Sequence, residues 1–458
     1  MKFKIFSAII IAKTMTLILR LFGSGGTSLP GKAAMMVKGD LLSYLSKDVK
    51  TILITGTNGK TTTARIIAEI LKISGKTYFE NKSGANLISG ITATFAVNSS
   101  FNGKINCEFA VIECDEAAFK TVGKHINASL VIVTNLFRDQ LDRYGEITHT
   151  LNGIIDGIRS SRNAVLILNA DDSLSYSIKG SVPNETFLFG MDSPPYGQDT
   201  DFISDAPYCI KCKGRYAYDF RTYAHLGGFR CPECGYQREK PDYSADEISL
   251  GSSFSKAVFS LKGRSFRARV ALPGAYNIYN ALAAAAAAGE LGIRDKFILD
   301  GISTFRSGFG RMEVLSLDDI SVHMILVKNP AGLNQVINFL ANDPALKILV
   351  MILNDRHADG TDISWIWDAN FEKISAGADK FDRIILSGTR AEELLLRFKY
   401  SGIDVTGISA TKSYPDVILK AIDQNTAKLP VYILPTYTAM FDFRKALSRK
   451  YKIKKFWK

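Results

Sequence analysis

Short apolar runs alternate with longer amphipathic segments through the first part of the chain. The apolar runs are rich in β-branched residues and lie at 51–55 (TILIT), 109–113 (FAVIE), 130–134 (LVIVT) and 165–168 (VLIL). Runs of this kind are typical of buried strands, and the segments between them, such as 61–73, are typical of crossover helices. The pattern predicts an α/β fold built on a parallel sheet.

A second alternating region begins near residue 312. Its expected strands are 348–353 (ILVMIL), 383–386 (RIIL) and 431–434 (VYIL), and its expected helices are 390–398 and 414–423. We therefore predict two α/β domains, 51–310 and 311–458, with the boundary between residues 307 and 311.

The N-terminal segment, residues 1–50, is basic and apolar. Lys13 and Arg20 interrupt the apolar run at 3–22, so the run lacks the roughly 20 uninterrupted apolar residues of a membrane span. No convincing cleavage site for a signal peptide follows it. Two interpretations stay open, a helix that packs on the domain and a helix that lies at a membrane surface.

Composition excludes several classes of protein. The 458 residues are 46% hydrophobic and 22% charged, which excludes a disordered tail protein, a collagen-like chain and a small disulfide scaffold. The 57 Lys and Arg residues exceed the 45 Asp and Glu residues by 12, and this excess favours an anionic partner such as a nucleotide, a phospholipid or a nucleic acid. The chain has six cysteines, too few for a disulfide framework in a protein of this length.

A glycine-containing loop, GTNGKTT, separates the first predicted strand from the first predicted helix. Glycines let main-chain amides converge on an anion, and the helix start adds the positive end of a dipole. In such a loop the lysine meets the β- and γ-phosphates, and the hydroxyl that follows it ligates Mg²⁺. The predicted nucleotide-binding residues are Gly56, Thr57, Asn58, Gly59, Lys60, Thr61 and Thr62.

Glu113 ends the predicted strand 109–113 and opens the acidic run Glu113-Cys114-Asp115-Glu116. Carboxylates at the carboxyl end of a strand in an open α/β sheet lie on the ligand-binding edge. We predict that Glu113 holds a Mg²⁺ ion between ATP and an acceptor carboxylate.

Four cysteines, Cys209, Cys212, Cys231 and Cys234, form two CxxC pairs inside a segment, 205–240, that interrupts the α/β pattern. The spacing predicts a tetrahedral Cys₄ zinc site, and the alternative is four reduced thiols. Because cysteine fills every position, the zinc would be structural. Zinc ribbons also occur in nucleic-acid proteins, so an ATP-regulated nucleic-acid binder is one alternative function.

The segments 54–63, 112–116, 134–146, 273–288 and 309–313 together resemble the Mur ligase superfamily: ITGTNGKTTT, IECDE, TNLFRDQLDRYGE, PGAYNIYNALAAAAAA and FGRME. A narrower resemblance, to the MurT family, rests on the Cys₄ ribbon and on two further segments. These are GTSLPGK at 26–32 and ADGTDISWIWD at 358–368.

The resemblance implies a Mur ligase central ATP-binding domain that carries the zinc ribbon, followed by a Rossmann-like C-terminal domain. It implies an enzyme of peptidoglycan synthesis that uses ATP and Mg²⁺ to convert the α-carboxyl of D-glutamate in lipid II into an acyl phosphate. Ammonia then attacks this intermediate to give D-isoglutamine. It also implies a cytoplasmic heterodimer that makes peripheral contact at the inner face of the membrane.

The implied partner is a GatD-like glutaminase that releases the ammonia, and an Asp of this chain completes its Cys–His pair. The candidates are Asp355, Asp359 and Asp362, and we select Asp359 because a residue before Gly360 at a turn tip can project into a partner. The resemblance also assigns Asn277 to the adenine site and Arg311 to the γ-phosphate.

Three departures from the superfamily affect these assignments. Tyr276 stands where the adenine segment usually has a histidine. Gln140 stands where Mur ligases usually place a histidine ligand of Mg²⁺, so a weaker or water-filled second metal site is expected. The segment 327–330 (VKNP) replaces a block that carries an acidic residue. A second alternative function is an amino-acid ligase like folylpolyglutamate synthase; the ribbon and the segment 358–368 argue against it.

Overall fold

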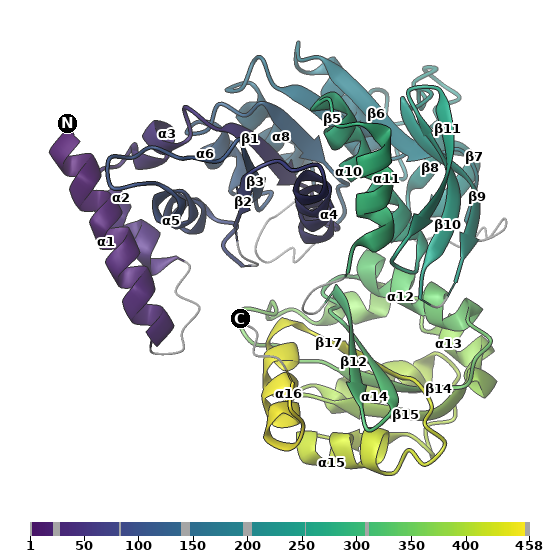
Figure 1. Cartoon of the computed structure of the whole chain (residues 1–458). Helices are drawn as coiled ribbons and strands as arrows, with labels where there is room; N and C mark the ends of the chain where they lie inside the picture. Colours follow the sequence, from purple (N-terminus) through teal and green to yellow (C-terminus); the bar gives the residue numbers. More distant parts are fainter. Residues whose placement is uncertain are drawn as a thin grey trace.

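The computed structural model describes residues 2–21, 28–81, 84–138, 147–195, 204–251, 253–306 and 311–453. Within these ranges the strands form a nine-stranded sheet, a six-stranded sheet and a two-stranded hairpin. Figure 1 shows the two large sheets in separate halves of the molecule, with the helix α12 near their junction.

The first sheet has the strand order β11-β10-β9-β6-β5-β4-β1-β3-β2. Its strands are β1 (Lys50–Thr55), β2 (Tyr78–Glu80), β3 (Phe109–Glu113), β4 (Leu130–Val133), β5 (Val165–Asn169), β6 (Thr186–Met191), β9 (Tyr243–Leu250), β10 (Ser255–Leu261) and β11 (Arg264–Val270). The pairs from β2 to β9 are parallel, which confirms the predicted parallel sheet. The antiparallel extension β9-β10-β11 was not predicted, because its strands alternate buried and exposed positions and give a weaker apolar signal.

Helices cover both faces of this sheet. One face carries α4 (Lys60–Ile73), α10 (Ala275–Glu290) and α11 (Asp295–Thr304). The other carries α3 (Leu41–Leu45), α5 (Ile88–Asn98), α6 (Phe119–Gly123) and α8 (Ile147–Ile158), and the short α9 (Ser173–Ser177) follows β5. The alanines of α10 are fully buried, so this helix lies deep in the core beside α4, where small side chains permit close packing.

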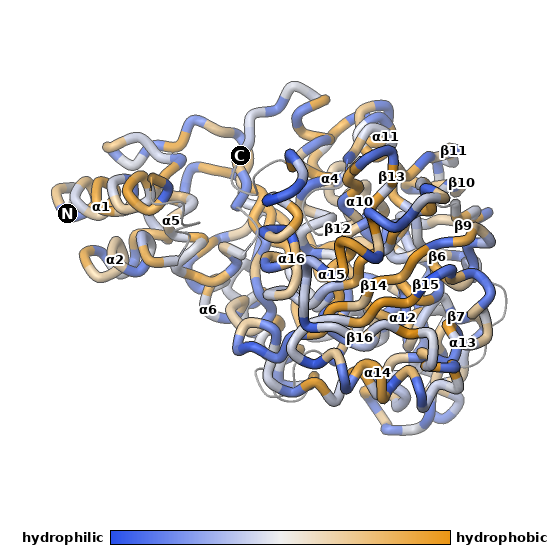
Figure 2. The backbone as a smooth tube through the Cα atoms, turned by 90° about the horizontal axis from the view of Figure 1, so that it is seen from below, coloured by the Kyte–Doolittle hydropathy of each residue, from blue (hydrophilic) through white to orange (hydrophobic). Residues whose placement is uncertain are grey.

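The N-terminal helices α1 (Lys2–Leu21) and α2 (Leu29–Val37) pack together at the edge of the first domain, against α5. Ile5, Ala8, Ile9 and Ala12 of α1 are buried there. This packing confirms the interpretation of the N-terminal segment as a helix that packs on the domain. The opposite face of α1 stays exposed. Figure 2 shows this apolar helix at the margin of the molecule. Across the described residues, helices fall short of the length and apolarity that a membrane crossing requires.

The second sheet has the order β12-β13-β17-β14-β15-β16, parallel except for the pair β12–β13. Its strands are β12 (Arg311–Leu317), β13 (Ile320–Ile325), β14 (Lys347–Ile352), β15 (Phe381–Ser387), β16 (Ser409–Thr411) and β17 (Val431–Pro435). One face is covered by α12 (Pro330–Asn342), α13 (Glu372–Ala376) and α14 (Ala391–Tyr400), the other by α15 (Tyr414–Ile418) and α16 (Tyr437–Lys450). The helix predicted over 414–423 is α15 followed by a π-helical turn at Leu419–Asp423.

The segment between β6 and β9 contains the hairpin β7 (Ala217–Tyr223) and β8 (Leu226–Arg230), which pair antiparallel. Cys212 precedes β7, and Cys231 directly follows β8. The hairpin therefore extends from the two cysteine pairs, and its tip reaches the first sheet.

Candidate active site

The predicted phosphate loop joins β1 to α4 at the carboxyl edge of the first sheet. Gly56 and Gly59 have φ angles of 119° and 87°, a region that side chains rarely adopt. A Cβ atom on Gly59 would lie 2.1 Å from the Asn280 Oδ1 atom, and one on Gly56 would lie 2.4 Å from the Thr134 Oγ1 atom. Both glycines are therefore required by backbone conformation and by space.

The end of β4 holds this loop in place. The Thr57 amide donates to the Asn135 carbonyl oxygen at 2.8 Å, and the Asn58 amide donates to Asn135 Oδ1 at 2.9 Å. The Thr134 hydroxyl donates to the Asn58 carbonyl oxygen at 2.7 Å. These bonds fix the loop before any ligand is present, which lowers the entropy lost on binding.

Two carboxylates, one at the last residue of β3 and one just beyond it, meet the first residues of α4. The Lys60 ammonium lies 2.8 Å from Glu116 Oε2 and also donates to the carbonyl oxygens of Gly56 and Thr57. The Thr61 hydroxyl donates to Glu113 Oε2 at 2.7 Å. Lys60, Thr61 and both glutamates are buried.

The electrostatics of this cluster favour its charged form. Burial opposes the charge on Lys60, but Glu116, Asp115 and Glu113 raise its pKa above the usual value. Burial also opposes ionisation of Glu116, but Lys60 and Lys328 outweigh it and lower the pKa of Glu116. Burial and the neighbouring Glu116 raise the pKa of Asp115. Lys328 follows β13, so a charge from the second sheet acts on the acidic run of the first.

The donor atoms at this edge suit a hard divalent cation. Thr61 Oγ1 and Glu113 Oε2 lie side by side, and oxygen donors of this kind are the ligands that Mg²⁺ prefers.

Two other residues named from the sequence fall outside the described part of the structure. Gln140 lies outside it altogether. The side chain of Arg311 lies outside it, although the Arg311 backbone begins β12.

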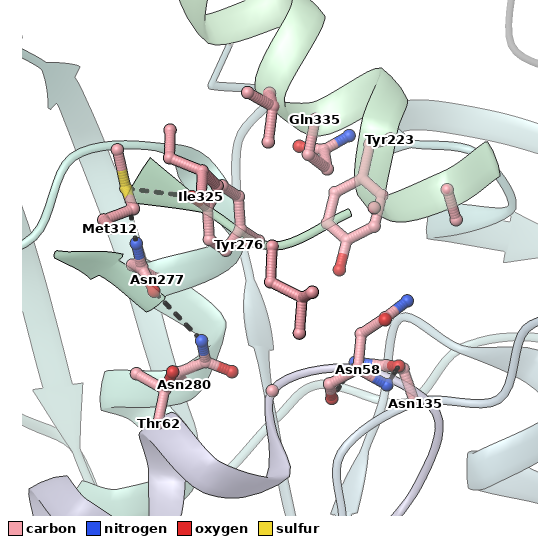
Figure 3. A pocket seen from close by; sticks show the side chains of 15 residues that line it. Asn58, Thr62, Asn135, Tyr223, Tyr276, Asn277, Asn280, Met312, Ile325 and Gln335 are labelled. Atoms are coloured by element: carbon pink, nitrogen blue, oxygen red, sulfur yellow. Dashed lines mark hydrogen bonds between the residues drawn. The ribbon is translucent and has the colours of Figure 1, made fainter. Parts of the chain in front are cut away.

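A pocket opens beside the phosphate loop, between the two sheets, with about 690 Å³ of empty space including its open mouth. Asn58, Thr62 and Asn277 line it, as the sequence predicts for nucleotide-binding residues. Further lining residues come from the hairpin, from α10, from β12 and β13, and from α12: Tyr223, Tyr276, Asn280, Met312, Ile325 and Val336. Figure 3 shows the side chains of Tyr223, Tyr276, Asn280, Met312 and Ile325 around one shared space.

Polar side chains of this pocket are held in place by contacts with neighbouring residues. The Asn277 side-chain amide donates to the Pro273 carbonyl oxygen at 2.7 Å, and the Asn280 amide donates to Asn277 Oδ1 at 3.1 Å. The Tyr276 hydroxyl contacts the Met312 sulfur at 3.0 Å. Fixed polar groups beside aromatic and aliphatic side chains are typical of small-molecule pockets.

The second sheet also touches the phosphate loop directly. The Asn329 side-chain amide donates to Asn58 Oδ1 at 3.2 Å, while Asn329 Oδ1 caps α12 by accepting from the Gly332 amide at 2.8 Å. One residue thus joins the start of α12 to the loop of the other sheet.

The four predicted metal ligands come together. Their sulfur atoms all lie within 4.8 Å of one another; those of Cys209 and Cys234 are 3.6 Å apart and those of Cys212 and Cys231 are 3.4 Å apart. All four are free thiols. A tetrahedral zinc ion with Zn–S bonds of about 2.3 Å separates its sulfurs by about 3.8 Å, so the cluster fits such an ion.

The turn that carries Asp359 folds back on the protein. Asp359 is 6% exposed; its carboxylate accepts from the Thr438 amide at 2.6 Å, from the Thr438 hydroxyl, and from the Arg356 amide at 3.2 Å. Asp359 therefore lies against the start of α16. The expectation from the sequence, that the position before Gly360 projects outward from the turn, is wrong. Asp355 contacts Arg390 at 2.7 Å.

Glu116 and Tyr223 are the site residues that sequence reasoning missed. Glu116 lies in the acidic run that the sequence singled out, so its role as a partner of Lys60 could have been suspected from that run. No local pattern marks Tyr223 as a pocket residue, because its position depends on the fold of the hairpin.

The chain matches two sequence families over separate parts of its length and curated relatives along nearly its whole length. Residues 54–206 match the Mur ligase middle domain, and residues 326–440 match the MurT ligase C-terminal domain. The chain is 38% identical over 433 residues to the lipid II isoglutaminyl synthase (glutamine-hydrolyzing) subunit MurT of Streptococcus pneumoniae (strain ATCC BAA-255 / R6), covering 94% of each protein. The chain belongs to the MurT family of Mur ligases. It is 36% identical over 455 residues to the lipid II isoglutaminyl synthase (glutamine-hydrolyzing) subunit MurT of Staphylococcus aureus (strain COL), covering 97% of this chain and 98% of the relative.

Solved structures share the Mur ligase fold with this MurT-family chain. A pseudomurein peptide ligase type C from Methanothermus fervidus has a TM-score of 0.67 at 23% identity, over 90% of this chain and 80% of that one. The MurF ligase of Thermotoga maritima in complex with ADP has a TM-score of 0.63 at 15% identity, over 91% and 85%. The family and the fold predicted from the sequence are confirmed, and the MurT-family chain is a Mur-type, ATP-dependent ligase.

Proposed function

We propose that this protein amidates the α-carboxyl of D-glutamate in the stem peptide of lipid II, giving D-isoglutamine for peptidoglycan synthesis. The observation that carries the proposal is the buried cluster of Lys60, Thr61, Glu113 and Glu116, next to the loop residues that line a pocket between two sheets. The relatives named as MurT subunits of lipid II isoglutaminyl synthase supply the acceptor and the reaction.

The phosphate loop and the pocket would share the nucleotide between them. Asn277 and its neighbours would take the adenine, and the loop of residues 56–62 would take the phosphates. Lys60 would exchange contacts with Gly56 and Thr57 for the β- and γ-phosphates, because its ammonium already lies inside the loop. Arg311 would neutralise charge on the γ-phosphate as it transfers.

Thr61 and Glu113 would hold Mg²⁺, which would supply a positive charge against the phosphate oxygens. The acceptor carboxylate would attack the γ-phosphorus of ATP, forming an acyl phosphate and releasing ADP. Ammonia would then attack the acyl carbon, and inorganic phosphate would leave as the amide forms. Positioning and charge neutralisation would supply most of the acceleration.

A GatD-like glutaminase subunit would release the ammonia from glutamine, and Asp359 would complete its Cys–His pair. A carboxylate that orients an imidazole must itself be held, and the Thr438 and Arg356 amides hold Asp359. A buried, amide-bonded aspartate of this kind resembles the aspartate of a catalytic triad in its environment.

The four cysteines would bind a structural zinc ion, since they leave no coordination position for a substrate.

We place the division between the two α/β domains between residues 310 and 311, where the second sheet begins.

We also propose that α1 contacts the inner face of the membrane, where a lipid-linked acceptor would lie. Its outer face exposes Phe3, Leu17 and Leu21 at 79%, 61% and 78%, and Arg20 is exposed beside them. Apolar residues flanked by basic ones suit an anionic membrane surface. Replacing both Leu17 and Leu21 with glutamate should abolish sedimentation of the protein with anionic vesicles, whereas Leu396→Glu on α14 should not. Equal sedimentation of the wild type, the double variant and Leu396→Glu would contradict this contact.

The decisive experiment combines the full chain with a candidate glutaminase, lipid II, ATP, Mg²⁺ and glutamine. Mass spectrometry should detect replacement of one carboxyl hydroxyl by an amino group, and Lys60→Ala should abolish it. Attachment of an amino acid instead would favour the folylpolyglutamate-like alternative. Tight, salt-sensitive binding of RNA or DNA without amidation would favour the nucleic-acid alternative.

A further inference from the structure

The tip of the ribbon hairpin forms part of the pocket wall. Tyr223 ends β7 and lines the pocket. Figure 3 shows its ring across the pocket from Tyr276, with the hydroxyl directed toward the loop that carries Asn58 and toward Asn135. A side chain from the cysteine-bearing insertion therefore faces the space assigned to the nucleotide.

The base of the same hairpin is built by the cysteine turns. The Cys209 amide donates to the Gly214 carbonyl oxygen at 2.7 Å, and the Cys231 amide donates to the Tyr236 carbonyl oxygen at 2.7 Å. Each CxxC pair is thus a closed turn at one end of the hairpin. An ion shared by both pairs would tie the entry of β7 to the exit of β8.

The ribbon is anchored on the first sheet at two points that converge on one residue. The Tyr279 hydroxyl lies 2.8 Å from the Thr222 hydroxyl at the hairpin tip and donates to Asp171 Oδ2 at 2.6 Å. The Arg238 guanidinium, beyond the second cysteine pair, donates to Asp171 Oδ1 at 2.6 Å. The tip and the exit of the ribbon are therefore held by the same buried carboxylate.

Phe137 connects the tip to the phosphate loop. Its ring stacks on Tyr223 at 5.8 Å between centroids and lies 4.7 Å from the ring of His225. Its main-chain amide donates to the Thr57 hydroxyl at 2.9 Å, and that hydroxyl donates to the Phe137 carbonyl oxygen at 3.2 Å. The buried His225 ring in turn lies 3.2 Å from Asp172 Oδ1. A displaced hairpin would disturb both the pocket wall and the loop.

We propose that the four-cysteine ribbon positions the nucleotide pocket: a metal ion at its base holds the β7–β8 hairpin, and Tyr223 at its tip contacts the bound nucleotide. This inference rests on the proposed function, because it takes the pocket to be the nucleotide site. It assigns the ribbon a role in affinity for the nucleotide, beyond folding of the insertion itself.

The test measures the dissociation constant of ADP by calorimetry and the zinc content of the full chain by mass spectrometry. Tyr223→Ala should weaken ADP binding about 5- to 10-fold while zinc stays bound, a loss typical of one aromatic contact and one hydrogen bond. Tyr223→Phe, which keeps the ring, should lose less. Tyr208→Ala, at a 62% exposed tyrosine of the same insertion, should bind ADP like the wild type.

The ribbon itself is tested at its two exposed sulfurs, with Cys212→Ser and Cys234→Ser combined. This variant should lose zinc and weaken ADP binding by a factor like that of Tyr223→Ala. Adding Tyr223→Ala to it should cause little further loss, because both changes act through the same contact. If the cysteine variant weakened ADP binding by a route other than Tyr223, the two fold-losses would multiply, and that result would overturn the inference.

Unchanged ADP binding by Tyr223→Ala, or by a zinc-free cysteine variant, would overturn the inference. Failure of the proposed function is distinguishable from this result. If the wild type does not bind ADP, the proposed function fails. If the wild type binds ADP and Lys60→Ala does not, while the Tyr223 and cysteine variants bind normally, only the ribbon inference fails.

Discussion

The Lys60 ammonium and the Glu116 carboxylate form an ion pair at 2.8 Å in which both side chains are buried. The pair keeps a positive charge inside the phosphate loop before a nucleotide arrives. A nucleotide therefore meets a lysine that is already charged, and Glu116 is the group that must share it.

Removing one partner of this pair should destabilise the protein. We expect Glu116→Gln to lower the free energy of unfolding by about 3 kcal/mol, because it removes the carboxylate that a buried ammonium contacts directly. Denaturant unfolding measures the change. Glu69→Gln removes a partner of the exposed Lys72 at 3.3 Å and should cost less than about 1 kcal/mol; equal effects of the two substitutions would contradict this account.

The same pair predicts a dependence of stability on pH. The pKa of Glu116 is lower in the folded protein than its usual value of 4.5, where burial is outweighed by Lys60 and Lys328. The stabilisation is therefore present above the unfolded-state pKa and is lost as the pH falls through the folded-state pKa. The stability difference between the wild type and Glu116→Gln should be full at pH 7 and should shrink in acid. A difference that grows in acid would reverse the sign and refute the assignment.

Two neighbouring threonines on α4 should respond differently to valine. Thr61→Val removes the hydroxyl beside Glu113 and should lower Mg²⁺-dependent amidation about 100-fold, because the ion loses an oxygen ligand. Thr63→Val is the matched control, since the buried Thr63 hydroxyl has no hydrogen-bond partner among the described residues. Initial rates across a Mg²⁺ titration measure both, and similar rates for the two variants would remove Thr61 from the ion site.

Two glycines with similar backbone angles separate strain from collision. Gly59→Ala should weaken ADP binding at least about 10-fold, because its Cβ atom would meet Asn280 Oδ1 at 2.1 Å. Gly75→Ala places a Cβ atom at φ 75° with nothing within 4 Å and should cost only about 1–2 kcal/mol of stability from backbone strain. Calorimetry and thermal unfolding distinguish the two losses. Normal ADP binding by Gly59→Ala would contradict this prediction, because it would show that the loop can shift to accommodate the added methyl group.

Asp359→Asn should impair glutamine-driven amidation at least about 10-fold, since a neutral amide does not stabilise a charged imidazole. Amidation driven by ammonium salt should be retained, which separates the partner's glutaminase step from damage to the synthetase. Asp355→Asn and Asp362→Asn are the controls. If one of these loses glutamine use while Asp359→Asn keeps it, the assignment moves to that residue.

The elements that local pattern determines were predicted well. The strands β1, β3, β4 and β5 are continuous apolar runs, and the loop from Gly56 to Lys60 has a spacing that few other structures require. Contacts between distant segments were not predicted. Tyr223 enters the pocket because Thr222 meets a tyrosine of α10. Asp359 turns inward because the Thr438 amide at the start of α16, 79 residues later in the chain, donates to it. Neither partner is visible from the sequence near the residue itself.

Asn329 joins the two sheets at the phosphate loop, and the pocket beside it takes walls from both. A small molecule bound there acts as a bridge between two separately folded halves, and its binding energy stabilises each against local melting. Calorimetric scans should therefore show the two halves unfolding together when the pocket is saturated, even where the empty protein unfolds in stages.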